Sequence, residues 1–214
     1  MLQPVDRLDA QFLLGFSTAL GLLSRPEVAE RWFMPSVLPK MSVGALACHL
    51  GRQAVRAVEC LPAATDVPPL ASADAHYHSA AWVTSTSPND PPNDRATDNA
   101  DAALGADALV QRATAAMEAA RGVIAGGEAR NVVLIPWQGW SLRRDDFLLT
   151  RLVETVVHTD DLALSIDVEA PAFPEEVAAP VLELLLRLAV TRHGQSAVIS
   201  TLTRRERSQI ISAF

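Results

Sequence analysis

Two residues that can share a metal ion lie one helical turn apart. Glu154 and His158 are separated by four positions, and residues with this separation lie on one face of an α-helix, with about 5–6 Å between their Cβ atoms. A carboxylate and an imidazole are both ligands of zinc-type cations. The same spacing also occurs in ordinary surface pairs, so the pair alone gives only weak support for a metal site.

A metal site needs a third ligand, and His49 is the best candidate in the chain. Three protein ligands leave one position open, which is typical of a catalytic rather than a structural zinc site. By its own helical pattern, however, His49 lies beside Gln53 and Arg56, away from the apolar face. That pattern taken alone favours a surface histidine.

The helix that carries Glu154 and His158 has a polar stripe and a wide apolar arc. The stripe contains Phe147, Thr150, Arg151, Glu154, His158, Asp161 and Ser165. The apolar arc covers more than half of the circumference, which predicts a largely buried helix. The stripe is then either the solvent-exposed edge of this helix or the floor of a cleft between helices, and helical geometry does not distinguish these two interpretations.

Helical periodicity and proline positions predict a bundle of four long helices with a short helical appendage after them. The expected bundle helices cover residues 5–24, 43–60, 101–125 and 144–166, and the appendage helices cover 174–193 and 195–212. Residues 61–99 are rich in proline, asparagine and aspartate, and we expect a long connection there with one helical piece near 71–83. The apolar run 132–137 has strand composition, but no partner is evident, which favours an extended loop.

Composition excludes several classes of protein. The net charge of −7, with one basic cluster at Arg204, Arg205 and Arg207, argues against nucleic-acid binding. No apolar run approaches the length of about 18–20 residues that spans a bilayer, so we expect no membrane insertion. The first ten residues lack a basic segment followed by an apolar one, and we therefore expect a cytoplasmic location.

The remaining cysteines and histidines have simpler interpretations. Cys48 and Cys60 lie in one predicted helix, about 18 Å apart by helical rise, too far for a disulfide, which favours free buried thiols. His76 and His78 form an H-x-H pair without a third ligand, which is more often polar surface. His193 precedes Gly194, where a cation favours a helix C-terminus.

Two segments, taken together, resemble a known family. Met41–Leu50, which contains His49, and Glu154–Ala163 resemble the metal-binding domain of mycothiol-dependent maleylpyruvate isomerase, in the DinB-like superfamily. The family pattern places a first histidine in the second helix and then E-x-x-x-H, followed by H-x-x-D-L, in the last bundle helix. Trp137–Trp140 and Asp146–Leu148 are also similar to the family. The resemblance covers about residues 5–166.

The resemblance implies an all-α, DinB-like up-down four-helix bundle over residues 1–168, with a helical extension, 169–214, packed on it. It implies a divalent metal, zinc in the first instance, held by His49, Glu154 and His158. Mycothiol or a similar small thiol is the implied cosubstrate. The isomerase also carries a C-terminal α/β domain, and residues 171–214 are predicted to be helical and too short for it. An electrophile other than maleylpyruvate is therefore favoured.

The expected chemistry is attack of a metal-activated thiolate on a small electrophile, since thiolate rather than thiol is the nucleophile. Departure of the sulfur after bond rotation gives an isomerase, and its retention gives a thiol transferase. Arg151 is the candidate for orienting a substrate carboxylate, or else an ion-pair partner of Glu154 or Asp145. Gln53 is the candidate for a hydrogen bond to the thiol.

Asp161 is either the acceptor for the N–H of a ligand imidazole or a surface carboxylate. The alternative function is a non-catalytic metal- or small-ligand-binding protein of the same fold. A homodimer is left open.

Overall fold

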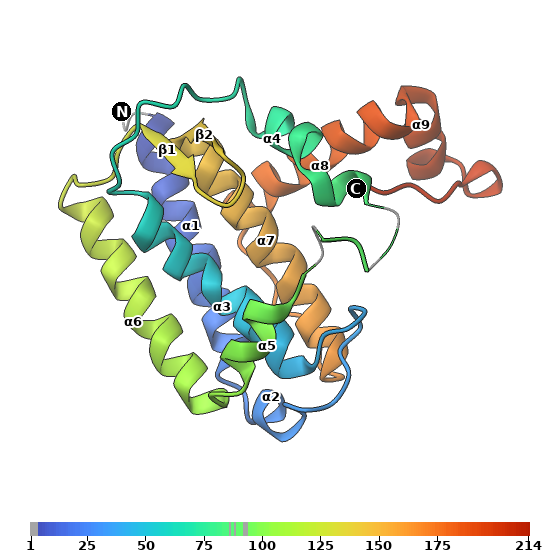
Figure 1. Ribbon diagram of the computed structural model, residues 1–214. Coiled ribbons are helices and arrows are strands. Elements are labelled where there is room, and N and C mark those ends of the chain that lie inside the picture. The colour runs from blue at the N-terminus through green and yellow to red at the C-terminus, as the bar shows by residue number, and fades with distance from the viewer. Residues whose placement is uncertain (1–3, 86, 88, 92–93) are drawn as a thin grey trace.

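The computed structural model describes residues 4–85, 87, 89–91 and 94–214. It confirms the expected all-helical bundle. Its four long helices are α1 (Pro4–Leu23), α3 (Val43–Cys60), α6 (Ala106–Ala125) and α7 (Arg144–Ser165), and α1 and α3 each contact both α6 and α7 (Figure 1). None of the helices in the described ranges is both long and apolar enough to cross a membrane.

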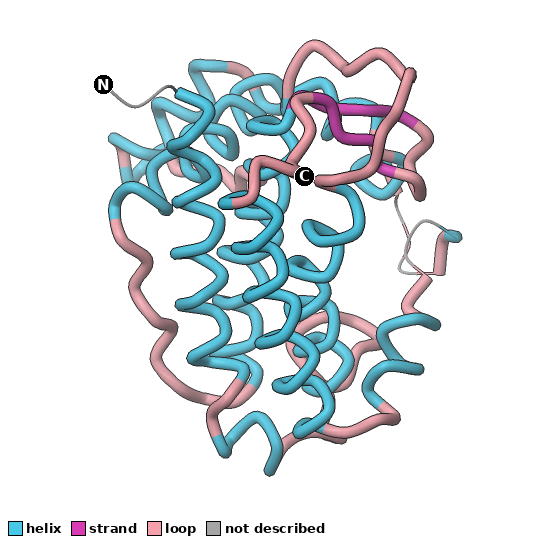
Figure 2. Tube along the Cα trace, turned by 90° about the vertical axis from the view of Figure 1, so that its left-hand side faces the viewer, coloured by secondary structure: helices cyan, strands magenta, loops and turns pink. Residues whose placement is uncertain are grey.

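The middle two helices of the bundle run in the same direction. Gly51 of α3 lies against Leu109 of α6, and beyond the ends of these helices the Leu61 carbonyl accepts a hydrogen bond from the Arg130 amide. Helices α1 and α7 run the opposite way, so the directions along the chain in the view of Figure 1 are down, up, up, down (Figures 1 and 2). The long connection between α3 and α6 makes this possible, because it returns the chain to the other end of the bundle.

This connection contains more helix than expected. It forms α4 (Ala73–Ser79), the 3₁₀ turn η1 (Ala81–Thr84) and α5 (Ala96–Ala102). The bundle helix expected over 101–125 begins only at Ala106, because Gly105, with φ +89°, separates α5 from α6. The indole N–H of Trp32, which follows the short helix α2 (Pro26–Glu30), donates to the Ala102 carbonyl and fixes the end of α5 on the bundle.

The extended loop expected at 132–137 is also wrong. Val132–Ile135 forms strand β1, which pairs antiparallel with β2 (Trp140–Arg143), Ile135 opposite Trp140. The missing partner strand therefore begins five positions after Ile135, beyond a four-residue turn in which Gly139 has φ +80°. The hairpin leads directly into α7 and lies at one end of the bundle (Figure 1).

The last part of the chain packs on the bundle through α8 (Glu175–His193). Val177, Val181 and Leu184 of α8 are fully buried in one apolar cluster with residues of α1 and α7. Helix α9 spans Gln195–Thr203, shorter than the expected 195–212, and the 3₁₀ turn η3 spans Arg205–Arg207. The imidazole of His193 accepts a hydrogen bond from the Ser212 amide, so it holds the final segment rather than only the end of α8.

Both cysteines have the expected state. Cys48 and Cys60 are free and buried. Burial raises the pKa of the Cys48 thiol to about 12, and it also raises the pKa of Cys60. At neutral pH both are protonated apolar side chains of the core, not nucleophiles.

Candidate metal centre and adjoining cavity

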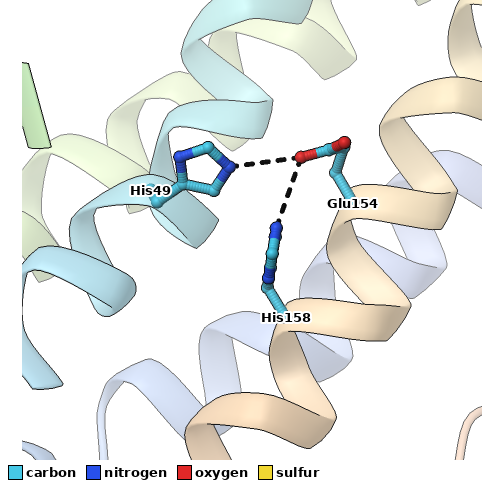
Figure 3. Close-up of side chains that lie close together, drawn as sticks. All are labelled: His49, Glu154 and His158. Carbon is cyan, nitrogen blue, oxygen red and sulfur yellow. Dashed lines mark hydrogen bonds and ion pairs between the residues drawn. The ribbon is translucent and has the colours of Figure 1, made fainter. Parts of the chain in front are cut away.

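His49, Glu154 and His158 meet between α3 and α7, as Figure 3 shows. One carboxylate oxygen, Glu154 Oε2, lies 3.2 Å from His49 Nε2 and 3.4 Å from His158 Nε2. The imidazole planes are nearly perpendicular, with ring centroids 4.8 Å apart. One potential ligand atom from each residue lies within 4.8 Å of the other two. The three side chains therefore converge on one point.

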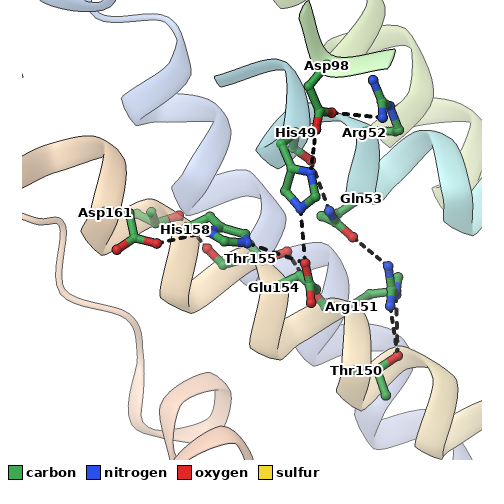
Figure 4. A network of polar contacts seen from close by, with 11 residues as sticks. His49, Arg52, Gln53, Asp98, Thr150, Arg151, Glu154, Thr155, His158 and Asp161 are labelled. Carbon is green, nitrogen blue, oxygen red and sulfur yellow. Dashed lines mark hydrogen bonds and ion pairs between the residues drawn. The ribbon is translucent and has the colours of Figure 1, made fainter. Parts of the chain in front are cut away.

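Local features of the two helices set this convergence. The Ser42 hydroxyl accepts from the Ala45 amide and caps α3, as expected for an N-cap residue. Because α3 and α7 are antiparallel, His49 lies opposite Glu154, and Gln53, one turn later, lies opposite Arg151, one turn earlier (Figure 4). The polar stripe on α7 thus faces α3 and a cavity. The alternative interpretation, a solvent-exposed outer edge of the helix, is wrong.

Each imidazole is held from behind by a carboxylate (Figure 4). His49 Nδ1 lies 3.1 Å from Asp98 Oδ2, and His158 Nδ1 lies 2.9 Å from Asp161 Oδ2. An ionised carboxylate only accepts hydrogen bonds, so both Nδ1 atoms must donate. When the rings are neutral, the lone pairs of both Nε2 atoms face Glu154 and the centre of the site.

Asp98 is supported in turn by Arg52, whose Nη1 lies 2.8 Å from Asp98 Oδ1. Burial alone would raise the pKa of Asp98, but the hydrogen bond from His49 and the charge of Arg52 hold it below its usual value. Asp98 is therefore ionised at neutral pH. The sequence offered no reason to choose it from the acidic residues of the long connection.

The pKa values of Glu154 and His158 indicate that the three converging residues favour a positive charge between them. Burial alone would raise the pKa of Glu154, but hydrogen bonds from His158 and His49 hold it well below its usual value. Burial would lower the pKa of His158, but hydrogen bonds to Asp161 and Glu154 raise it to about 9. Without a cation, a proton must lie between imidazole and carboxylate. A divalent ion at the same point would satisfy all three ligands, so the donor set fits a zinc-type metal.

A cavity of about 320 Å³ adjoins the three residues. Its other walls come from segments distant in sequence, including the long connection and the hairpin turn. The lining residues include His76, Trp82 and Asp98 of the connection, Arg56 of α3, Trp137 of the hairpin turn, and Phe214. The last segment of the chain thus contributes a side chain to the cavity.

Arg151 lies on the cavity wall. Its side chain is 3% exposed, and its guanidinium donates to Gln53 Oε1 at 2.8 Å and to Thr150 Oγ1 at 3.3 Å. Within the described ranges it has no ion pair with Glu154 or Asp145. Its guanidinium is thus positioned by uncharged partners, and its positive charge is available to an anion in the cavity.

Gln53 lies behind the cavity wall and not on it. Its side chain is fully buried, its amide nitrogen donates to the His49 carbonyl, and its amide oxygen accepts from Arg151. Because the side chain is fully buried, the direct hydrogen bond to a thiol that the sequence led us to expect stays a prediction. The geometry instead gives Gln53 the task of linking His49 to Arg151.

Arg56 and His76 also line the cavity, and the sequence analysis gave neither of them a role in the site. Arg56 lies seven positions after His49, which is two helical turns on the same face, so spacing alone could have indicated it. His76 was interpreted as polar surface, but it is 3% exposed and lines the cavity. Its partner His78 is exposed, so the two do not act as a pair.

Comparisons with known proteins agree with this geometry. The family model of the mycothiol maleylpyruvate isomerase N-terminal domain matches residues 16–163, which include the last part of α1, all of α3 and α6, nearly all of α7 and all three converging residues. Comparison with curated proteins and with solved structures finds no match. The family model covers well over half of the chain. The chain therefore belongs to the mycothiol maleylpyruvate isomerase N-terminal domain family.

Proposed function

We propose that this protein is a metal-dependent enzyme that uses a small thiol of the mycothiol type to isomerise or conjugate a small electrophile. The observation that carries the proposal is the convergence of His49, Glu154 and His158 beside a cavity. No fourth His, Cys, Asp or Glu joins this group in the part of the chain that the structure describes. A structural zinc site would be closed by four protein ligands, whereas a catalytic one keeps a position open.

The three residues would hold the ion, with zinc the first choice for two nitrogen ligands and one oxygen ligand. When bound, such an ion would act as a Lewis acid and lower the pKa of a coordinated thiol. Asp98 and Asp161 would fix the orientation of the imidazoles and increase their basicity, and partners of this kind typically change metal affinity by about 10- to 100-fold.

Arg151 would bind an anionic group of the substrate. It lies on the same helix as two proposed ligands, and Gln53 and Thr150 hold its guanidinium in place. Arg151 makes no ion pair with an acidic side chain among the residues that the structure describes, so its guanidinium is available for a carboxylate. Arg56 Cζ lies 4.3 Å from the centroid of the Trp137 ring. The Trp137 ring would supply an apolar face for the body of the thiol or the substrate.

The test combines metal content with thiol-dependent turnover. We expect one zinc per chain in the wild type, and loss of both zinc and turnover in His49→Ala, Glu154→Ala and His158→Ala. His78→Ala removes an exposed imidazole and is the matched control, which should keep both. Equal zinc content in all four variants would contradict the proposal. Bound zinc without thiol-dependent turnover of any electrophile would instead favour a non-catalytic metal-binding protein.

A further inference from the structure

His76 of α4 and Trp140 of β2 form a partly buried hydrogen bond beside the cavity. Trp140 Nε1 lies 3.1 Å from His76 Nδ1. An indole N–H can only donate, so His76 Nδ1 must accept. An imidazole that accepts at Nδ1 carries its single proton on Nε2 when it is neutral. The indole therefore selects the tautomer of His76.

The surroundings of His76 keep the ring neutral and fixed. Burial, together with the nearby charge of Arg151, lowers its pKa to about 4, with the Glu154 carboxylate acting weakly in the opposite direction. The ring of Tyr77 lies edge-on at 5.0 Å and that of Trp140 at 5.8 Å, which restricts rotation of the imidazole. At neutral pH His76 is thus an uncharged, oriented side chain.

The Nε2–H group is available to a molecule in the cavity. His76 lines the same cavity as Arg151 and Glu154, and Nε2 has no hydrogen-bond partner among the residues that the structure describes. Because the pKa of His76 is lowered, its neutral ring, which already carries a proton on Nε2, does not take up a second proton near pH 7. Its available chemistry is to donate a hydrogen bond to an oxygen.

Other cavity residues add donors rather than acceptors around that position. Arg56 also lines the cavity, and no ion pair to it is found in the described part of the chain. Arg151 is held only by neutral partners. Two of the acidic cavity residues, Asp98 and Glu154, are already engaged by imidazoles. This distribution favours a substrate that presents oxygen atoms, not donors, to His76 and the two arginines.

We infer that His76 is a catalytic hydrogen-bond donor to the carbonyl oxygen of the electrophile. The electrophile is taken to have, like the maleylpyruvate in the name of the family, a carbonyl group conjugated to a carbon–carbon double bond. The inference rests on the proposed function, since a thiolate is the nucleophile. Its sulfur lone pair forms the C–S bond at the β-carbon, the alkene pair moves to the Cα–C bond, and the carbonyl π pair moves to oxygen. The charge on oxygen strengthens its hydrogen bond from Nε2–H, and no proton leaves His76.

From this common enolate both outcomes of the proposed function follow. Rotation about the new Cα–Cβ single bond and reversal of the electron flow expel the thiolate and give the isomer. Alternatively, a proton from water at Cα gives the thiol conjugate and hydroxide. Donors placed where negative charge develops stabilise such a transition state more than the ground state. His76 therefore serves either reaction.

The tautomer is tested directly by ¹⁵N NMR of protein labelled at histidine, with the His76 signals identified in His76→Gln. The chain has five histidines, so the spectrum is simple. We expect a neutral His76 with Nε2 protonated and Nδ1 unprotonated from pH 5.5 to 8, and proton exchange between the two nitrogens in Trp140→Phe. Protonation at Nδ1, or titration of His76 within that range, would overturn the inference whether or not the protein turns over any substrate.

The catalytic role is tested by kinetics on the zinc-loaded protein with a thiol and a conjugated enone. Loss of one such donor typically lowers kcat by about 10²- to 10³-fold, and we expect this for His76→Phe with little change in KM. His76→Gln, which keeps an N–H near the Nε2 position, should lie within about tenfold of wild type. His78→Phe is the exposed control on the same helix. Equal kcat for His76→Phe and wild type would overturn the role of His76, whereas absence of turnover in the wild type would count against the proposed function itself.

Discussion

At the scale of single residues, carboxylates contact the two imidazoles of the candidate centre from two sides. Glu154 faces both imidazoles from within the centre, and Asp98 and Asp161 hold them from outside. This arrangement fixes which ring nitrogen each histidine presents. It also concentrates negative charge, which only protons or a cation can balance.

The stability of the metal-free protein should depend on the charge of His158. Its pKa in the folded protein is raised to about 9, against about 6.5 in an unfolded chain. The stabilisation is therefore fully present below pH 6.5 and is lost as the pH rises through 9. Glu154, whose pKa is lowered, contributes in the opposite sense: its stabilisation is lost in acid, below the usual glutamate range.

Urea unfolding with a chelator present, at pH 6.5 and at pH 9, measures this effect. We expect the free energy of unfolding of the wild type to fall more between these two values than that of His158→Gln, which has no imidazole to titrate. An equal fall in the two proteins would contradict the assigned electrostatics. Added zinc should reverse the trend, since the ion requires unprotonated imidazoles.

At the scale of elements, sequence periodicity predicted the four bundle helices and placed the two ligand-bearing segments on α3 and α7. It failed for features that depend on a distant partner. His49 looked like a surface residue by the pattern of its own helix, but α7 and Asp98 of α5 bury it. The hairpin was missed because its second strand, Trp140–Arg143, has no apolar run of its own.

His76 was misjudged for the same physical reason. Its burial depends on contact with Trp140, more than sixty residues away, which a local pattern does not encode. By contrast, Glu154 and His158 could be recognised because both lie on one helix. The sequence therefore predicted the contacts within helices well and those between helices only through the family resemblance.

The start of α3 should be sensitive to any side chain at Gly44. A Cβ atom built there would lie 2.5–2.8 Å from atoms of the Trp32 indole, which is itself held by the Ala102 carbonyl. We expect Gly44→Ala to lower the free energy of unfolding by about 1–3 kcal/mol through overpacking. Gly21→Ala is the control, because nothing lies within 4 Å of that position in α1, and it should be neutral or stabilise by up to about 1 kcal/mol. Equal effects in chemical denaturation would contradict this packing.

At the scale of the whole molecule, we propose that residues 1–168 form a bundle domain and that 169–214 form an extension packed on it. The extension covers α1 and α7 with buried side chains such as Val177 and Val181. It also supplies Phe214, whose ring lies 5.0 Å from those of Tyr77 and Trp82 at the cavity. The extension therefore contributes both to stability and to the site.

Truncation after residue 168 tests this division. We expect the shortened protein to remain helical by circular dichroism and to bind zinc, but to unfold at a lower Tm because apolar residues of α1 and α7 lose their cover. Loss of all cooperative unfolding would contradict the division and indicate one indivisible core. An unchanged Tm would contradict the packing role of the extension.

The central claim is that His49, Glu154 and His158 hold a metal with a position open to a thiol. It is tested most directly by titrating cobalt-substituted protein with mycothiol and recording the absorption spectrum. We expect a thiolate-to-cobalt charge-transfer band that saturates with one thiol per metal and is missing in His158→Ala. A spectrum that does not change at millimolar mycothiol would contradict the claim.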